Sequence, residues 1–471
     1  MIEGVGRYPA YRESGIEWVG EVPRHWKTPT CQRVFRETTR PYQGTTEVQL
    51  SLSQRQGLVP TTLMHERSLQ TSSFDKWKVV FPGDIVVNRF KGHLGVFFAA
   101  NMRGITTFHY GVFRSRTAVV AKYFEWLFHT PQYCAIFGAR SNGMTVGLQN
   151  LSNQNFYNVR ALLPPPDEQA AIVRFIDHAD RRIRRYIREK QKLIGLLDEQ
   201  KQAIIHRAVT RGLDPHVRLK PSGVEWLGDV PEHWEVLALR RRWQVTDCKH
   251  LTVPFVDEGY PLASVREAQT FELSFASSNR TTKEWFEKLI DGGRRPKRGD
   301  LVYCRNVNVG AAALVTTDEP FAMGQDVCLI RSERQSQRWL NYFLRSHGMK
   351  EQLGQLLVGS TFNRINVADI KALLVVVPPR DEQDRIVAHL DREVGTLNIA
   401  INELRTEQAL IREYRTRLIA DVVTGKLDVR AAAAALPDEP AEDEPLDALT
   451  DDPGDEAADT EESDAEEGAA A

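Results

Sequence analysis

Apolar residues recur at alternating spacings of four and three positions in two long stretches of the chain. The first pattern runs from Ile172 to Ile204, and the second runs from Ile386 to Leu418, at an offset of 214 residues. Such spacing places side chains on one seam of a coiled coil. The predicted seam positions are Ile172, Ile176, Ala179, Ile183, Tyr186, Lys190, Leu193, Leu197, Gln200 and Ile204, then Ile386, Leu390, Leu397, Leu404, Ile411, Tyr414 and Leu418. We predict two long helices that pair antiparallel with each other; two amphipathic helices packed on separate domains are the alternative.

Short apolar runs bounded by Gly and Pro precede each helical stretch. They lie at residues 79–81 and 84–87 in the first half and at residues 300–303 and 312–315 in the second. Runs of this length between turn residues predict β-strands. The predicted fold class is therefore α+β, with two strand-rich domains and two long helices that form an antiparallel coiled coil.

Three segments of the first half return in the second. Ser14–Trp26 matches Ser222–Trp234, and two shorter pairs, which start at Gly83 and Gly299 and at Pro165 and Pro379, follow in the same order. Between them, residues 45–77 have no convincing counterpart in residues 254–285. A repeat of this length indicates a duplicated domain rather than a solenoid, whose units run to about 20 to 50 residues. We infer two equivalent binding events with different specificities.

Charge is distributed unevenly along the chain. The formal net charge is −2, yet residues 431–471 contain 16 Asp and Glu and no Lys or Arg, so that residues 1–430 carry 61 basic against 47 acidic groups. A basic body suits a polyanion such as DNA, because released counterions supply much of the affinity; an Arg-rich solvated surface is the alternative. The acidic segment has too few large apolar residues to form a core and is predicted to be disordered.

The sequence contains no apolar stretch long enough for a membrane span and no basic region followed by an apolar one at its N-terminus. We therefore expect a cytoplasmic protein. Its five cysteines are scattered without CxxC spacing, which argues against a zinc site or a disulfide framework.

Motifs for catalysis are missing from the sequence. There is no Asn/Asp-Pro-Pro-aromatic motif of amino-methyltransferases, no GxxxxGK(S/T) phosphate loop and no GxGxxG. The carboxylate string that begins at Asp198 lies in a predicted helix and is interpreted as ordinary helical charge. His25 and His233 are interpreted as parts of structural turns, and the repeated tryptophans as core residues. The chain is predicted to be non-catalytic.

Together these repeats resemble the specificity subunit of type I restriction-modification systems. The duplicated tryptophan segment, the Pro-(Pro/Arg)-Asp-Glu-Gln helix starts, the two long helices and the divergent interiors occur in the order of that family over roughly residues 8–430. The acidic tail departs from the family pattern. The resemblance implies target recognition domains at 1–163 and 214–377, spacer helices at 164–213 and 378–430, and a tail at 431–471.

The resemblance also implies a function. Each recognition domain would read one half of a bipartite asymmetric site in double-stranded DNA, and the complex would direct adenine methylation or cleavage by partners. Those partners are two methyltransferase subunits and the motor-nuclease subunits that join through the complex. This chain would bind no cofactor or metal itself, while S-adenosylmethionine, ATP and magnesium would act on the partner subunits.

Polar residues near Gly at equivalent points of the two halves are the candidates for base contacts. Arg and Lys suit guanine edges, and Asn and Gln suit adenine. The predicted DNA-binding residues are Asn88, Arg89, Lys91, Asn142, Thr145, Gln149 and Asn150 in the first half, and Arg305, Asn306, Asn308, Thr361, Asn363 and Arg364 in the second. For any one of them, a solvated loop position is the alternative.

Two other classes of function fit the same features. One is a two-domain DNA-binding repressor or architectural protein without enzyme partners, which would differ in not binding methyltransferase chains. The other is a coiled-coil scaffold for proteins alone, which would lack the steep salt dependence of DNA binding.

Overall fold

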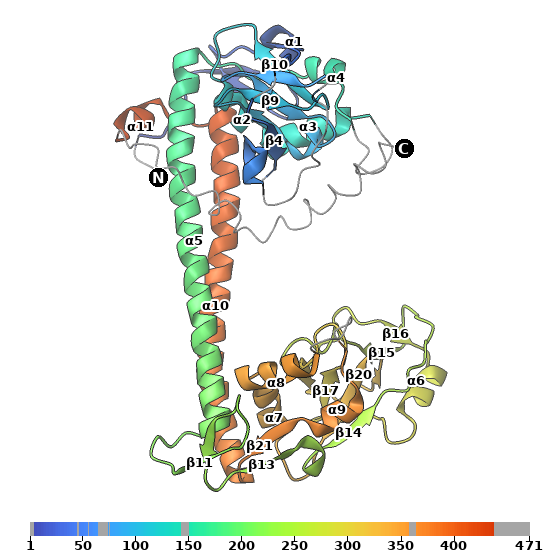
Figure 1. Cartoon of the computed structure of the whole chain (residues 1–471). Helices are drawn as coiled ribbons and strands as arrows, with labels where there is room; N and C mark the ends of the chain where they lie inside the picture. The colour runs from blue at the N-terminus through green and yellow to red at the C-terminus, as the bar shows by residue number, and fades with distance from the viewer. Residues whose placement is uncertain are drawn as a thin grey trace. The chain divides into compact units, whose positions relative to one another are not determined.

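The computed structural model of the chain describes residues 4–44, 47–54, 56–64, 74, 76–142, 150–357 and 364–437. They form two compact units, drawn in Figure 1: Met1–Lys190 with Thr406–Ala471 is unit 1, and Gln191–Arg405 is unit 2. The two long helices, α5 (Pro166–Arg211) and α10 (Arg380–Val423), each contribute one segment to either unit.

Unit 1 is built on an antiparallel four-stranded sheet in the order β3-β10-β7-β8. Strand β7 has only buried residues because both faces of the sheet are covered: Ile85 and Val87 face one core, and Val86 faces the other. Three further strand pairs, β1-β2, β4-β5 and β6-β9, surround the sheet. The strands are β1 (Tyr11–Glu13), β2 (Glu21–Pro23), β3 (Phe35–Glu37), β4 (Leu50–Ser53), β5 (Gly57–Pro60), β6 (Lys78–Val80), β7 (Ile85–Asn88), β8 (Phe97–Ala99), β9 (Gly104–Thr106) and β10 (Tyr110–Ser115).

Helices cover one face of this sheet and close an aromatic core around Phe97, Phe128 and Phe137. The helices of unit 1 outside the long pair are α1 (Cys31–Val34), η1 (Thr61–Leu63), η2 (Gly92–Leu94), α2 (Ala121–Phe128), α3 (Pro131–Arg140), α4 (Asn153–Tyr157) and α11 (Arg430–Ala435).

Unit 2 repeats the central sheet, in the order β14-β20-β17-β18. Its inner strand β17 also alternates between two cores, with Leu301 and Tyr303 facing one and Val302 the other. The strands are β11 (Leu219–Pro221), β12 (Asp229–Pro231), β13 (Glu235–Ala238), β14 (Gln244–Asp247), β15 (Tyr260–Ala263), β16 (Arg280–Thr281), β17 (Leu301–Cys304), β18 (Ala312–Leu314), β19 (Ala322–Met323), β20 (Val327–Arg331) and β21 (Leu374–Val377). The predicted strands at residues 84–87, 300–303 and 312–315 are confirmed.

The two sheets share a frame and differ in what is inserted. Between β3 and β7, unit 1 has the β4-β5 hairpin and β6, whereas between β14 and β17, unit 2 has β15, β16 and helix α6 (Lys283–Ile290). The other helices of unit 2 are η3 (Leu239–Arg241), α7 (Gln337–Leu344), α8 (His347–Leu357) and α9 (Val367–Ala372). The divergence that the sequence showed therefore corresponds to different elements on equivalent sheets.

The repeated Gly-Asp pair forms the turn that leads into the inner strand of each sheet. Gly83 and Gly299 have φ of +87° and +91°, a left-handed conformation that favours glycine. The following carboxylates accept backbone N–H bonds within the turn, Asp84 from Phe81 at 2.9 Å and Asp300 from Lys297 at 2.8 Å. This repeat therefore has a local structural cause.

The long helices pair antiparallel, as predicted. In unit 1, Arg415 binds Asp180, and the Gln408 side chain donates to the backbone carbonyl of Ile187 at 3.1 Å. In unit 2, Lys201 donates to Asn398 at 3.4 Å. Partner numbers fall along α10 as they rise along α5, which is the order of an antiparallel pair (Figure 1).

The predicted seam is wrong for several positions. Tyr186, Leu193 and Tyr414 are 51%, 44% and 49% exposed, whereas Ile194 and Ile401, outside the prediction, are buried. An α-helix repeats every 3.6 residues, so a strict seven-residue pattern drifts around a nearly straight helix. The contact line therefore moves by one residue on α5, and several predicted seam residues face outward.

The start of the predicted disordered tail also differs. Residues 430–435 form helix α11, and Ala432 and Ala433 are buried in the core of unit 1. Arg174 donates to the carbonyl of Leu436 at 2.7 Å. Small alanine side chains let this helix pack closely, which composition alone did not indicate. The rest of the predicted tail, residues 438–471, lies outside the described residues.

Among the described residues, no helix has the length and apolar character needed to cross a membrane.

Candidate nucleic-acid interface

The repeated tryptophan segment and the repeated helix start meet in each unit. In unit 1, Glu168 on the first turn of α5 accepts hydrogen bonds from the indole of Trp26 and lies beside the imidazole of His25, both at 2.8 Å. In unit 2, Glu382 on the first turn of α10 lies 3.0 Å from the indole of Trp234 and 2.9 Å from His233. We call each set a Glu-Trp-His clamp.

The glutamine that follows each clamp residue holds the preceding chain. Gln169 donates to the carbonyl of Pro164 and accepts from the N–H of Val120, and Gln383 makes the same pair of bonds with Pro378 and Ser336. All four bonds are 2.8 or 2.9 Å long. The Asp-Glu-Gln repeat therefore fixes a long helix to a sheet domain, and His25, His233, Trp26 and Trp234 have the structural role that the sequence predicted. The prediction of a core position is wrong for Trp18, which is 36% exposed, and Trp226 is only partly buried.

Replacing Glu168 by Ala is expected to destabilise unit 1. The change leaves the buried Trp26 indole N–H without its acceptor, which costs about 1 to 3 kcal/mol. Asp167→Ala is the matched control, because Asp167 is exposed on the same helical turn. Chemical denaturation measures both variants, and an unchanged midpoint for Glu168→Ala would contradict a stabilising role for the clamp.

Four of the predicted DNA-binding residues of unit 1, Asn88, Arg89, Asn142 and Asn150, come together where strand β7 ends. Asn88 ends β7, and its side-chain oxygen accepts from the N–H of Phe90 at 3.1 Å. Asn142 and Asn150 exchange backbone hydrogen bonds of 2.9 and 2.8 Å at the base of a loop. The N–H of Leu151 donates to the carbonyl of Arg89 at 2.9 Å and so joins the two sets.

Unit 2 repeats this arrangement. Asn306 forms an isolated β-bridge with Arg364, and the N–H of Ile365 donates to the carbonyl of Arg305 at 2.9 Å. Asn308 is exposed in the turn that follows. Four of the predicted residues, Thr145, Gln149, Thr361 and Asn363, lie outside the described residues.

Exposure separates the described candidates into three groups: buried, partly buried and exposed. Asn88 and Arg305 are buried, at 9% and 5% exposure, and Arg89 is partly buried. The side chains of Asn142, Asn150, Asn308 and Arg364 are exposed, while Lys91 and Asn306 are half-buried. That any of them contacts DNA stays a prediction.

The two repeated arginines bind carboxylates that the sequence did not indicate. Arg89 Nη2 lies 2.5 Å from Glu37 at the end of β3, and Arg305 Nη1 lies 2.5 Å from Asp247 at the end of β14. Glu37 also lies 3.5 Å from Lys78, whose pKa is lowered mainly by burial. These acids stand 52 and 58 residues from their arginines, so only strand pairing brings them together.

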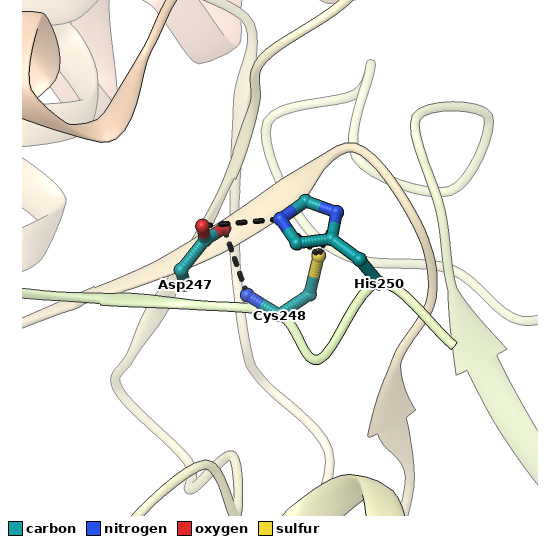
Figure 2. Close-up of side chains that lie close together, drawn as sticks. All are labelled: Asp247, Cys248 and His250. Carbon is teal, nitrogen blue, oxygen red and sulfur yellow. Dashed lines mark hydrogen bonds and ion pairs between the residues drawn. The ribbon is translucent and has the colours of Figure 1, made fainter.

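Asp247, Cys248 and His250 offer three possible metal ligands within 4.8 Å of one another, as Figure 2 shows at the end of β14. Two observations favour an ion pair over a metal site. Arg305 Nη1 lies 3.2 Å from His250 Nε2 as well as 2.5 Å from Asp247, so a cation already occupies this place. Burial raises the pKa of the Cys248 thiol, whereas a metal ligand is a thiolate. We therefore treat the group as part of the network around Arg305.

Comparisons with known proteins found a matching family model and similar proteins. Residues 259–410 match the Methylase_S family model, the type I restriction modification DNA specificity domain. Over 301 residues the chain is 23% identical to the type I restriction enzyme MjaVIII specificity subunit of Methanocaldococcus jannaschii, covering 62% of this chain and 67% of that protein. A putative MjaX specificity subunit of the same organism is 21% identical over 290 residues, 60% of this chain and 63% of that protein.

A solved structure has the same fold. A chain from work on complex assembly and conformational transition of the type I R-M system aligns with a TM-score of 0.64 and 16% identity, covering 85% of this chain and 98% of its own length. The predicted α+β fold class is therefore confirmed. Together with the family model and the relatives, this match confirms the predicted resemblance to the specificity subunits of type I restriction-modification systems. That class of proteins recognises DNA sequence.

Proposed function

We propose that this chain is the DNA-reading subunit of a type I restriction-modification complex. Each unit reads one half of a bipartite asymmetric site, and partner subunits methylate adenine or cleave. One observation carries the proposal: two equivalent sheets, β3-β10-β7-β8 and β14-β20-β17-β18, present polar segments at the same edge but bear different insertions. Because the two units share a frame and differ in their insertions, they suit recognition of two different DNA sequences by the same mechanism.

Methyltransferase docking would use residues that the helix pairing leaves exposed. Leu196 on α5 and Leu410 on α10 stand 214 residues apart, one in each unit, and are 52% and 59% exposed. Exposed leucines at equivalent positions of the two repeats suit two copies of one partner, because each copy would meet the same side chain. S-adenosylmethionine, ATP and magnesium would then act on the partner subunits, and the complex would work in the cytoplasm.

The test is methylome sequencing of a host that carries this chain with its cognate methyltransferase. A single asymmetric split site should be methylated, and the purified chain alone should show no methylation or cleavage. Methylation of a continuous site would contradict two separate reading units. DNA binding without any methyltransferase association would instead favour a two-domain DNA-binding repressor or architectural protein.

Charge substitution at the exposed leucines should remove methyltransferase subunits one at a time. Leu196→Lys or Leu410→Lys is expected to leave complexes with one bound methyltransferase, and the double variant with none, because each Lys must be desolvated in an apolar contact. Mass measurement of the assembled complex counts the subunits. Arg182→Lys, at an exposed position of α5, is the control. Two bound subunits on the double variant would exclude these leucines from the interface.

Removal of the acidic segment should tighten nonspecific DNA binding at low salt. Deleting residues 438–471 keeps α11 and changes the formal charge from −2 to +14. Sixteen acidic groups attached to a basic body compete with DNA, and salt screens the competition. Binding titrations between 50 and 300 mM salt should therefore converge for the two chains. Curves that coincide at every salt concentration would show that the segment does not compete.

A further inference from the structure

We propose that Arg305 in unit 2 and Arg89 in unit 1 are positioning residues, which hold the DNA-reading segments in place through a carboxylate partner and do not contact bases. The inference rests on the proposed function and concerns how the sequence specificity of each unit arises. The carboxylate partner is Asp247 for Arg305 and Glu37 for Arg89, and the sequence had indicated neither of them.

Arg305 connects four separate pieces of unit 2. Its side chain binds Asp247 at the end of β14 and lies 3.4 Å from the carbonyl of Ile365. Its backbone N–H donates to the carbonyl of Asp326, and its carbonyl accepts from Ile365, both at 2.9 Å. The positions of the exposed residues Asn308 and Arg364 therefore both depend on the contacts of the buried Arg305.

Two of those pieces are bound a second time. Arg364 Nη2 lies 3.3 Å from Asp326, next to the backbone contact of Arg305. Asp326 has a φ of +61°, a left-handed conformation unusual for a residue with a Cβ. The surrounding contacts must hold this conformation, so the direction of the neighbouring loop depends on them.

Arg89 occupies the same place in unit 1. Its carbonyl accepts from Leu151, as that of Arg305 does from Ile365, and both bonds are 2.9 Å long. Its guanidinium binds Glu37, which also accepts from the side chain of Asn153 in α4. The same geometry at the repeated arginine of each unit, with a different acid as its partner, indicates a shared task rather than a chance contact.

The chemistry favours positioning over base reading. A bidentate base contact needs two free N–H donors on one edge of the guanidinium. Arg305 is buried, its Nη1 faces Asp247 and His250, and its Nε lies 3.4 Å from the carbonyl of Ile365, so neither edge has two free donors. Each carboxylate would repel a DNA phosphate if it were exposed without its arginine. A paired charge inside the unit satisfies both groups and fixes their loops.

The test compares Arg305→Ala with Asp247→Asn in the complete complex, by methylome sequencing. If Arg305 acts through Asp247, both variants should broaden the half-site read by unit 2 at several positions, with about tenfold more methylation at single mismatches, equal to about 1.4 kcal/mol. The half-site read by unit 1 should not change. The double variant should be no worse than Arg305→Ala within a factor of two, since coupled residues are not additive. Glu37→Gln should have the same effect on the other half-site.

Arg298→Ala is the matched control, because Arg298 and Asp318 form an exposed pair in the same unit, at 3.1 Å. It should leave both half-sites unchanged. If Asp247→Asn keeps full selectivity while Arg305→Ala loses a single base position, Arg305 reads a base and the inference is wrong. Equal broadening of both half-sites would also overturn the inference, because it would indicate a general loss of stability and not a local effect on unit 2. If the wild-type complex methylates no bipartite site, the proposed function fails instead.

Discussion

Replacing residues 235–377 with a second copy of residues 27–163 is expected to give a target in which the half-site of unit 1 occurs twice. The two segments are equivalent, because each begins after the clamp tryptophan and ends before the repeated Pro-(Pro/Arg)-Asp-Glu-Gln start. Their ends lie next to each other in each unit: Glu235 pairs with Val377, and Lys27 forms a bridge with Leu163. Each segment is thus an insertion into a constant frame.

The physical reason is that each segment closes one core of its own, around Val86 in unit 1 and Val302 in unit 2, and packs a second core against the frame, which includes Ile172 in unit 1 and Ile386 in unit 2. The inner strand β17 is buried on both faces within unit 2, and β7 likewise within unit 1. A transferred segment therefore brings its own sheet and reading loops. The reciprocal chain, with two copies of residues 235–377, is the matched control and should double the other half-site. Methylome sequencing reads both outcomes, and a target in which both half-sites become new would contradict independent reading.

A double insertion in the long helices should lengthen the gap between the half-sites. Seven residues added after both Lys190 and Arg405 leave the pairs within each unit intact, including Lys190 with Glu407 and Lys201 with Asn398. The added turns extend the helix pair by about 10 Å, at about 1.5 Å per residue, which corresponds to roughly three base pairs. Both half-site sequences should stay the same.

The rotation of the duplex sets the expected cost of this change. Three base pairs turn the duplex by roughly 100°, while seven residues turn a helix by only about 20° from its starting direction. Twisting of the DNA or the helices must make up the difference, so we expect slower methylation at the longer gap. The same insertion in α5 alone should mismatch the pair and abolish a defined spacing. An active double variant with the original gap would show that the helices do not set the distance.

The periodicity of the sequence predicted the two long helices correctly, but it did not predict which residues of each helix contact the other helix. The 4-3 spacing, although interrupted at Lys190 and Gln200, was sufficient to predict two helices, because helix formation follows from a local pattern. The match between the two seams within one chain predicted their antiparallel pairing. The spacing was insufficient for the contact line, since Tyr186 and Leu193 face outward and Ile194 is buried. Which residues of a long helix touch its partner depends on the true helical repeat and the course of the neighbour.

By itself the sequence determined the duplication, the long helices and the resemblance to type I specificity subunits, because these leave repeated or periodic patterns along the chain. Only the tertiary structure decided what the repeats do: Glu168 and Glu382 clamp the helix starts, and Asp247 and Glu37 bind the repeated arginines. Those partners lie far apart in sequence, and nothing local marks a carboxylate as the one that strand pairing will bring beside a buried guanidinium. Burial and long-range contact are properties of the packed chain, and so the assignment of each polar residue to scaffold or surface had to come from the fold.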